Sequence, residues 1–392
     1  MRVLITEYVL STYHKDDTLI YLMPEAFTMV EFLAYSLIMN GAYVGITMSS
    51  LINSSLLSIL PGSIIVIDPH NYFDEISRLN KNFDYVIVIA PPKELVEIID
   101  LFDDEMLLQP SRKLIKLFSS KYTIVKELGK CGFKVPETKI IDLKHEHSSI
   151  SGTNFPIIVK PTYSAGSECV YLVNSDNELR QALLNTINCD PYGMVVLQDF
   201  INGVHGSISV VYGVNGPLFY SLNLQLIKNI NGSLRFIGGI LPIRKEEILN
   251  DVERIIHGLF TCYPELRGYV GLDVVWNNEG VCIIEVNPRP TTSIAGIVSL
   301  YPGFGKYMLS IHDRNMTQTA FLGDLINGYA YYVSYNNEVA DSLGMNEGVD
   351  KEIISIFQRT VEVGKTNNLI NIYQRIKPLL NNLVYDINDV LR

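Results

Sequence analysis

The strongest local pattern in the sequence is the stretch CIIEVNPRP at residues 282–290. Alternate side chains of a strand share one face, so Glu285 and Asn287 project together while their apolar neighbours point the opposite way. Pro288 and Pro290 then end the strand, because proline lacks the N–H that a sheet needs. The pattern predicts a strand that ends in a cluster of polar groups. A solvated sheet edge is the alternative, which the two prolines disfavour.

A second acidic residue precedes this strand across a tight turn. Asp273 lies in GLDVV, and Asn277–Gly280 is typical of the hairpin turn that would join the two strands. A hard cation such as Mg²⁺ is held by a few protein oxygens together with substrate phosphates. Asp273, Glu285 and Asn287 are therefore the candidate metal ligands. Arg289 follows at once, where its charge can neutralise a phosphoryl group in transfer.

A lysine ends another apolar strand. The stretch FPIIVKP at residues 155–161 places Lys160 just before the small-residue loop TYSAGSE at residues 162–168. A cation at this point can contact a phosphate, and the backbone N–H groups of such a loop can close over other phosphates. Small-residue loops after strands are common, so on its own the pattern is equally consistent with a structural role.

A third strand runs into a turn at VVLQDFING, residues 195–203. Backbone groups where such a strand ends can pair with the edge of an adenine, while Ile201 packs against the base. By itself the pattern is also that of an ordinary buried strand.

The first hundred residues alternate strand and helix patterns. Strand patterns lie at Arg2–Thr6, Tyr43–Thr47, Ser63–Asp68 and Tyr85–Ala90, and helix patterns at Glu25–Met39 and Glu94–Phe102. This alternation predicts an α/β domain at residues 1–110 with a doubly wound parallel sheet. Such a sheet places ligands beyond the carboxyl ends of its strands.

The rest of the chain has a different pattern. A helix pattern at Ser111–Cys131 precedes a mostly β stretch with hairpin turns at Asn215-Gly216 and Asn231-Gly232. We expect a small subdomain at residues 111–200 and an antiparallel-sheet subdomain with the metal site at residues 201–314. A mostly helical extension is expected at residues 315–392, with helices at Lys351–Glu362 and Asn368–Leu391.

The composition excludes several classes of protein. The 392 residues are 47% hydrophobic and 19% charged, which indicates a large folded core rather than disorder. The 31 basic and 42 acidic residues give a net charge of -11. Nucleic acid is therefore not expected as a partner, because no basic excess exists to neutralise its phosphates.

The apolar runs and the cysteines indicate the cellular location of the protein. Runs such as Ser63–Ile67 fall far short of the roughly 20 residues that span a bilayer, so no membrane partner is expected. The five cysteines form no CxxC pair. Neither a disulfide framework nor a zinc site is expected, and a cytoplasmic location is predicted. The polar stretch around His145-Glu146-His147 is typical of a loop rather than a metal site.

Taken together and in chain order, the motifs at residues 155–168, 195–203 and 282–290 resemble those of the ATP-grasp superfamily of carboxylate–amine ligases. The resemblance covers residues 111–293, and EVNPRP is its most specific part. The resemblance implies the ATP-grasp fold, with ATP and Mg²⁺, or Mn²⁺ in its place, as cofactors. The implied nucleotide-binding residues are Lys121, Lys160, Ser164, Gly166, Ser167, Gln198, Asp199, Phe200, Ile201 and His205.

The same resemblance implies the chemical roles. Asp273, Glu285 and Asn287 would hold the metal, and Lys160 and Arg289 would be catalytic, with Arg289 steadying an acyl phosphate. The flap at residues 164–167 has one glycine where many relatives have two or three. His205 stands where the family often has an acidic residue that contacts the ribose.

A finer resemblance suggests the substrates. The segments MPEAF at residues 23–27, Gly238-Gly239 and NPRPTTS at residues 287–293 are similar to those of archaeal tyramine–glutamate ligases. The likeness implies an amide between the side-chain carboxylate of L-glutamate and tyramine, formed through an acyl phosphate. Arg244 and Thr292 are the candidate substrate contacts, since an arginine can pair bidentately with a carboxylate.

Three alternatives stay open. The protein could join another amino acid and amine, bind a nucleotide without turnover, or phosphorylate a small molecule without forming an amide. The complete set of lysines and metal residues argues against a protein that only binds. A hydrophobic face on the C-terminal helices is equally consistent with packing on the core and with a homodimer contact.

Overall fold

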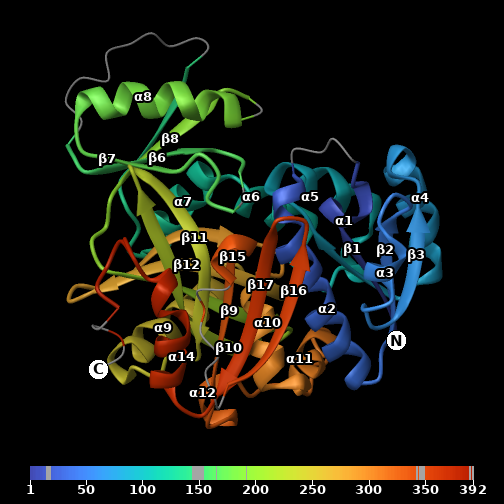
Figure 1. Ribbon diagram of the computed structural model, residues 1–392. Coiled ribbons are helices and arrows are strands. Elements are labelled where there is room, and N and C mark those ends of the chain that lie inside the picture. The colour runs from blue at the N-terminus through green and yellow to red at the C-terminus, as the bar shows by residue number, and fades with distance from the viewer. Residues whose placement is uncertain are drawn as a thin grey trace.

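A computed structural model describes residues 1–14, 19–143, 154–164, 166–190, 192–340, 343, 349–387 and 390. The histidine pair at residues 145–147 lies outside these residues. Within them the chain forms a four-stranded sheet and a 13-stranded sheet (Figure 1). The two sheets and the helices around them define where the candidate site lies.

The N-terminal domain is built on the four-stranded sheet. Its strands are β1 (Arg2–Glu7), β2 (Tyr43–Ser49), β3 (Ser63–Ile67) and β4 (Tyr85–Ile89), all parallel, in the order β3-β2-β1-β4. Alternation along β1 sends Val3 and Ile5 toward one face and Leu4 toward the other. The first face packs on α2 (Met23–Met39), and the second on α4 (Tyr72–Leu79) and α5 (Pro92–Ile98). The predicted doubly wound sheet is confirmed.

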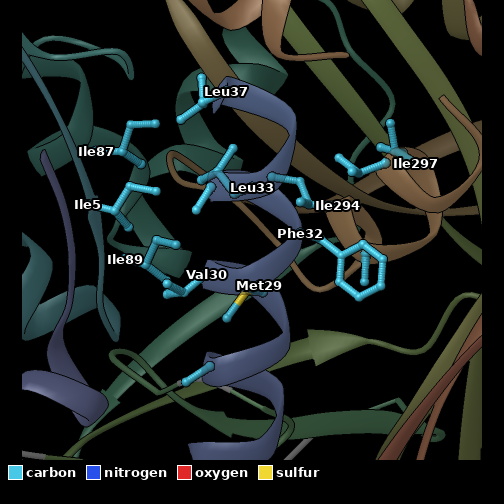
Figure 2. Close-up of a cluster of buried hydrophobic side chains, with 14 of the residues drawn as sticks. Ile5, Met29, Val30, Phe32, Leu33, Leu37, Ile87, Ile89, Ile294 and Ile297 are labelled. Atoms are coloured by element: carbon cyan, nitrogen blue, oxygen red, sulfur yellow. The ribbon is translucent and has the colours of Figure 1, made fainter. Parts of the chain in front are cut away.

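Helix α2 is apolar on both sides because it is buried on both sides. Figure 2 shows Val30 and Leu33 facing the sheet residues Ile5 and Ile89, while α10 (Ser293–Leu300) lies beyond the helix. Among the described residues, the stretch Ile20–Met39 is long and apolar enough to cross a membrane, yet 72% of that window is buried inside the protein. Burial between two layers accounts for its composition.

The next segment forms a small lobe, seen at the upper left of Figure 1. The helix predicted at Ser111–Cys131 is two helices, because Ser120 starts the second one by accepting a hydrogen bond from the Thr123 N–H. Both helices, α6 (Arg112–Phe118) and α7 (Lys121–Lys130), pack on the core of the large sheet, and the lobe itself consists of β5 (Thr138–Asp142), β6 (Ile157–Pro161), β7 (Tyr171–Val173), α8 (Asp176–Thr186) and β8 (Met194–Asp199). Its four strands are antiparallel, in the order β7-β6-β8-β5.

A large antiparallel sheet follows, and the predicted hairpins are present in it. Its strands are β9 (Val204–Gly213), β10 (Gly216–Ile230), β11 (Ser233–Leu241), β12 (Gly268–Asn277) and β13 (Gly280–Asn287), and α9 (Glu246–Cys262) packs against them. In the β10–β11 turn, Asn231 and Gly232 have φ of 51° and 87°, the left-handed backbone that a tight hairpin requires.

The prediction of a mostly helical C-terminal extension is wrong. The extension contains β14 (Ala320–Phe321), α12 (Leu322–Leu325), β15 (Tyr329–Asn336), α13 (Asn337–Ala340), β16 (Asp350–Ile356), β17 (Arg359–Thr366) and α14 (Leu369–Ile376). The helix predicted at Lys351–Glu362 is a hairpin of β16 and β17. The apolar residues of this stretch fit both the helix period of 3.6 residues and the strand period of two. In the structure, Ile354 and Ile356 are two residues apart and both enter the core that includes α2, as the strand period requires. The helix predicted at Asn368–Leu391 shortens to α14.

Strand β15 adds the extension to the central sheet. It pairs with β11 on one side and with β17 on the other. A Cβ at Gly238, whose φ is +144°, would lie 2.0 Å from the Tyr332 carbonyl oxygen. The pair Gly238-Gly239 therefore permits the close approach of β15.

A buried ion pair fixes the extension internally. Arg375 of α14 donates to both carboxylate oxygens of Glu362 on β17, at 2.8 and 2.6 Å. The hydroxyls of Tyr331 and Tyr335 also donate to this carboxylate. Glu362 is fully buried, so these donors replace the water that it loses.

The cysteine prediction was also wrong. Cys131 pairs with Cys262 and Cys169 pairs with Cys189 in disulfides, while Cys282 is free and buried. The members of each pair are 131 and 20 residues apart in sequence, so only the tertiary fold brings them together. The cysteine argument for a reducing compartment therefore falls, and the cytoplasmic location stays a prediction.

Candidate functional site

A cavity of about 230 Å³ lies where the small lobe faces the large sheet. It brings together every predicted site residue except Arg244. The lining includes Lys121, Lys160, Ser164, Gly166, Ser167, Gln198, Asp199, Phe200, Ile201, His205, Asp273, Glu285, Asn287, Arg289 and Thr292. These residues come from separate parts of the chain and meet only in the fold.

Two carboxylates lie side by side in this cavity. Asp273 on β12 is the register partner of Glu285 on β13. The side-chain amide of Gln225 donates to Asp273 Oδ1 at 2.8 Å, and that of Asn287 donates to Oδ2 at 3.3 Å. Burial and the neighbouring Glu285 raise the pKa of Asp273 to about 7, despite these donors.

This donor set fits a hard cation. Two carboxylates and the amide of Asn287 offer oxygen ligands, and a divalent cation would offset the repulsion that raises the pKa of Asp273. In the part of the chain that the structure describes, no group of three or more His, Cys, Asp or Glu side chains is placed to hold a metal. Such a site suits Mg²⁺ shared with substrate phosphates better than a closed protein cage.

Two buried lysines flank Glu285. The Lys121 Nζ lies 3.7 Å from Oε1, and the Lys160 Nζ lies 3.9 Å from Oε2. Burial, with a contribution from Lys121, lowers the pKa of Lys160 to about 8. Lys121 also donates to the Ser164 carbonyl oxygen at 2.5 Å, which links it to the flap. Paired cations beside a metal-type carboxylate suit the charge of a nucleotide polyphosphate.

The side chain of Gln198 has a role that the sequence did not indicate. Its Oε1 accepts a hydrogen bond from Lys160 at 2.9 Å, and its Nε2 donates to Thr138 Oγ1 at 3.1 Å. Thr138 in turn donates to the Pro136 carbonyl oxygen at 2.9 Å. Gln198 therefore positions the Lys160 ammonium, whatever its backbone contacts.

His205 presents a free ring nitrogen. Its ring lies between those of Phe200 and Tyr385, with centroid distances of 6.4 and 6.0 Å. Its Nε2 is buried, and no hydrogen-bond partner is found among the described residues. Burial lowers the pKa of His205 to about 4, so the ring is neutral near pH 7. A neutral ring nitrogen can pair with a ligand hydroxyl.

A network of polar side chains supports the segment that follows β13. Thr291 Oγ1 lies 2.8 Å from both the Tyr269 hydroxyl and Ser293 Oγ, and Ser209 extends the network. Thr291, Thr292 and Ser293 all line the cavity. Burial lowers the pKa of Arg289, opposed by nearby carboxylates, and its Nη1 donates to the Pro290 carbonyl oxygen at 3.0 Å.

Arg244 lies elsewhere. Its guanidinium donates to the carbonyl oxygens of Gly323, Ile326 and Gly328 at 2.8 to 3.1 Å. It also stacks over the Tyr329 ring at 4.6 Å. These contacts tie the C-terminal extension to the large sheet through Nε and Nη2, whereas Nη1 is buried without a hydrogen-bond partner among the described residues.

The sequence also missed lining residues. Phe236 and Tyr332 face the same cavity. Tyr332 and Tyr385 belong to the C-terminal extension, where no motif signalled a site.

Comparison with known proteins agrees with this geometry. Residues 118–293 match the family of ATP-grasp domains. Tyramine–L-glutamate ligase of Methanocaldococcus jannaschii is 30% identical over 56% of this chain and 59% of its own. The same-named enzyme of Methanocaldococcus fervens is 39% identical over 26% of this chain and 33% of its own. This chain thus covers less than two thirds of either relative.

A solved structure extends the likeness to the whole chain. The ADP complex of N5-carboxyaminoimidazole ribonucleotide synthetase superposes with a TM-score of 0.71 at 14% identity, covering 96% of each chain. At this identity the likeness concerns the fold alone. The chain has the ATP-grasp fold and contains an ATP-grasp domain at residues 118–293.

Proposed function

We propose that this protein is an ATP-dependent ligase that joins a small carboxylate to an amine through an acyl phosphate. The observation that carries the proposal is the meeting of Lys121, Lys160, Asp273, Glu285 and Arg289 around one cavity. A polyphosphate and a carboxylate are both anions. Two anions repel each other, so their reaction needs positive charge around both of them, which the buried cations and a bound metal ion would supply.

The residues divide the binding of ATP between them. Lys121 and Lys160 would neutralise phosphate oxygens, with Gln198 holding the second lysine in place. The strand end at Gln198–Ile201 would meet the adenine, and the free nitrogen of His205 would meet a ribose hydroxyl. The flap residues would cover the phosphates.

Mg²⁺ would be held by Asp273, Glu285 and Asn287. When bound, it would neutralise phosphate charge and polarise the phosphoryl group. A cation suits these oxygens because burial and the neighbouring Glu285 raise the pKa of Asp273, and a positive charge would offset both effects.

The chemistry proceeds in two balanced steps. A carboxylate oxygen of the acid forms a bond to the γ-phosphorus as the bond to ADP breaks. The amine nitrogen then bonds to the acyl carbon, inorganic phosphate leaves, and the nitrogen loses a proton. Lys160 and Arg289 would hold the phosphoryl oxygens in both steps, which is positioning and charge neutralisation rather than covalent catalysis.

L-Glutamate and tyramine are the proposed substrates. The names of the two Methanocaldococcus relatives and the NPRPTTS motif support this pair. A ligase for another amino acid and amine is the second candidate. A homodimer and a cytoplasmic location are further predictions, the first of which light scattering would test.

The test is ADP release with Mg²⁺-ATP and L-glutamate, with and without tyramine, followed by mass spectrometry. A tyramine-dependent rise in ADP together with a glutamyl-amide mass is the expected result. Removal of Mg²⁺ with EDTA should stop turnover, and added Mg²⁺ should restore it. ADP release without any amide across a panel of acids and amines would favour a kinase, and ATP binding without ADP release would favour a binding protein.

A further inference from the structure

A second cavity, of about 100 Å³, adjoins the nucleotide cavity on the side of the N-terminal domain. The two cavities share Gly166, Phe236, Arg289 and Thr292 in their linings. A molecule in the second cavity would therefore reach the phosphate end of the first at Arg289. We define the second cavity as the acceptor cavity.

The acceptor cavity carries charges of both signs. Glu7 lies at the end of β1, Glu25 in the first turn of α2, and Arg359 at the start of β17. Arg289 supplies a second guanidinium. The two acids come from the N-terminal domain, whereas Arg359 comes from the C-terminal extension. Only the complete fold assembles this set.

One carboxylate oxygen in this cavity has no partner. Glu25 Oε1 lies 3.2 Å from the Arg359 Nη2, but Glu25 Oε2 is buried and makes no hydrogen bond within the described residues. An unsatisfied buried acceptor is costly unless a ligand completes it. Burial raises the pKa of Glu25, and Arg359, Ser334 and the backbone N–H of Glu25 oppose this rise.

Arg359 is held in place by protein oxygens. Its Nη1 donates to the Tyr21 carbonyl oxygen at 3.1 Å, and its Nη2 donates to Ser334 Oγ at 2.9 Å. With the Glu25 contact, these interactions engage at most three of the five N–H groups of a guanidinium. Because Arg359 lines the cavity, its remaining N–H groups are candidate donors to a bound carboxylate.

We propose that the acceptor cavity binds the α-ammonium group of an amino-acid substrate at Glu25 and its α-carboxylate at Arg359. The inference rests on the proposed ligase function and deepens it. The side chain of the bound amino acid would extend toward Arg289 and Thr292. An acidic α-amino acid is then the substrate class, because its side-chain carboxylate meets the second guanidinium at the boundary with the nucleotide cavity.

The first test uses the unmodified protein and ligands that lack one group each. Calorimetry with a non-hydrolysable ATP analogue and Mg²⁺ present would compare L-glutamate, glutarate and 4-aminobutyrate. Glutarate lacks the ammonium, and 4-aminobutyrate lacks the α-carboxylate. We expect each to bind about tenfold or more weaker than L-glutamate, since each loses a charge-assisted hydrogen bond. Equal affinities for all three would overturn the proposal.

The second test assigns the groups to the residues. Glu25→Gln should weaken L-glutamate by about tenfold or more but leave glutarate nearly unchanged, since glutarate has no ammonium to lose. Arg359→Gln should weaken L-glutamate and leave 4-aminobutyrate nearly unchanged. Lys365→Gln, a charge removed from the same strand outside the cavity, is the matched control. Unchanged ATP affinity would show that each variant is folded.

The outcomes separate this inference from the proposed function. Binding that follows the expected pattern without ADP release would keep the cavity assignment and overturn the ligase. ADP release with variants that leave the KM for every acid unchanged would keep the ligase and overturn the assignment. If Glu25→Gln and Arg359→Gln raised only the KM for the amine, the cavity would bind the amine substrate, and this result would also contradict the proposal.

Discussion

Lys160 and Gln198 are joined across neighbouring strands, because the Lys160 ammonium donates a hydrogen bond of 2.9 Å to the Gln198 side-chain oxygen. Thr138 holds the other end of the amide at 3.1 Å. Burial disfavours the charged form of Lys160 and lowers its pKa to about 8. A hydrogen-bond acceptor such as Gln198 offsets part of this cost. The contact makes the position of Lys160 depend on a residue that the motif alone assigned to the adenine.

Gln198→Leu should therefore impair the use of ATP. Lys160 loses its acceptor, and we expect kcat/KM for ATP to fall by about tenfold, the cost of one charge-assisted hydrogen bond. Gln181→Leu, on the exposed face of α8, is the matched control. An unchanged kcat/KM for ATP in Gln198→Leu would remove its positioning role.

Glu285→Gln should cost far more in turnover than in stability. The change removes a proposed metal ligand and the carboxylate beside both lysines, so we expect the rate of ADP release to fall by about a hundredfold or more. The free energy of unfolding should change little, because the substitution also removes the repulsion from Asp273. Glu279→Gln, in the exposed turn of the same hairpin, is the control. A variant that stayed active and dependent on Mg²⁺ would refute the metal assignment.

Glu31 should make stability depend on pH. Burial in α2, with the nearby Glu352, raises the pKa of Glu31 to about 8 in the folded protein. The folded state therefore holds a proton that the unfolded state releases near pH 4.5. This contribution is fully present below pH 4.5 and is lost as the pH rises to about 8.

Glu31→Gln removes this dependence. We expect its Tm to exceed that of the unmodified protein more at pH 9 than at pH 5, as measured by calorimetry. The exposed substitution Glu97→Gln should shift the Tm equally at both pH values. A Tm difference independent of pH would contradict the raised pKa of Glu31.

Arg375→Met should strongly destabilise the protein. It leaves the Glu362 carboxylate buried without its cation, which costs about 3 to 5 kcal/mol in the free energy of unfolding. Adding Glu362→Gln should recover part of the loss, because no buried charge then remains. Denaturant unfolding of the single and double variants gives the comparison. A double variant as unstable as the sum of its singles would exclude coupling.

Arg244→Gln should act on stability rather than on substrate binding. Three backbone carbonyls of the C-terminal extension lose their donor, so we expect a loss of about 2 kcal/mol or more. The KM for each substrate should stay within about twofold. A large rise in the KM for the acid with an unchanged Tm would restore the original substrate prediction for Arg244.

Local patterns predicted much of the candidate site. Glu285 and Asn287 share a face because strand alternation is a local rule, and Asp273 is one hairpin away, so their proximity follows from short-range geometry. The loop after Lys160 follows its strand directly. Such features depend on neighbours in sequence, and residue types alone indicate them.

The C-terminal extension could not be predicted in the same way. Lys351–Glu362 has apolar residues that satisfy both a helix and a strand, and pairing with β15 decides for the strands. The disulfide partners and the Glu362–Arg375 pair are likewise set by contacts between distant segments. Local propensity carries no information about which distant strand offers its edge.

Periodicity and short motifs were enough to predict the parallel N-terminal sheet, the hairpins of the large sheet, and the lysines, acidic residues and arginine that line the first cavity. Only the folded chain shows that Gln198 holds Lys160, that Arg244 donates to three backbone carbonyls, and that Arg359 meets Glu25. The physical reason is distance along the chain. These contacts join segments whose encounter depends on the packing of the whole core, which no local pattern records.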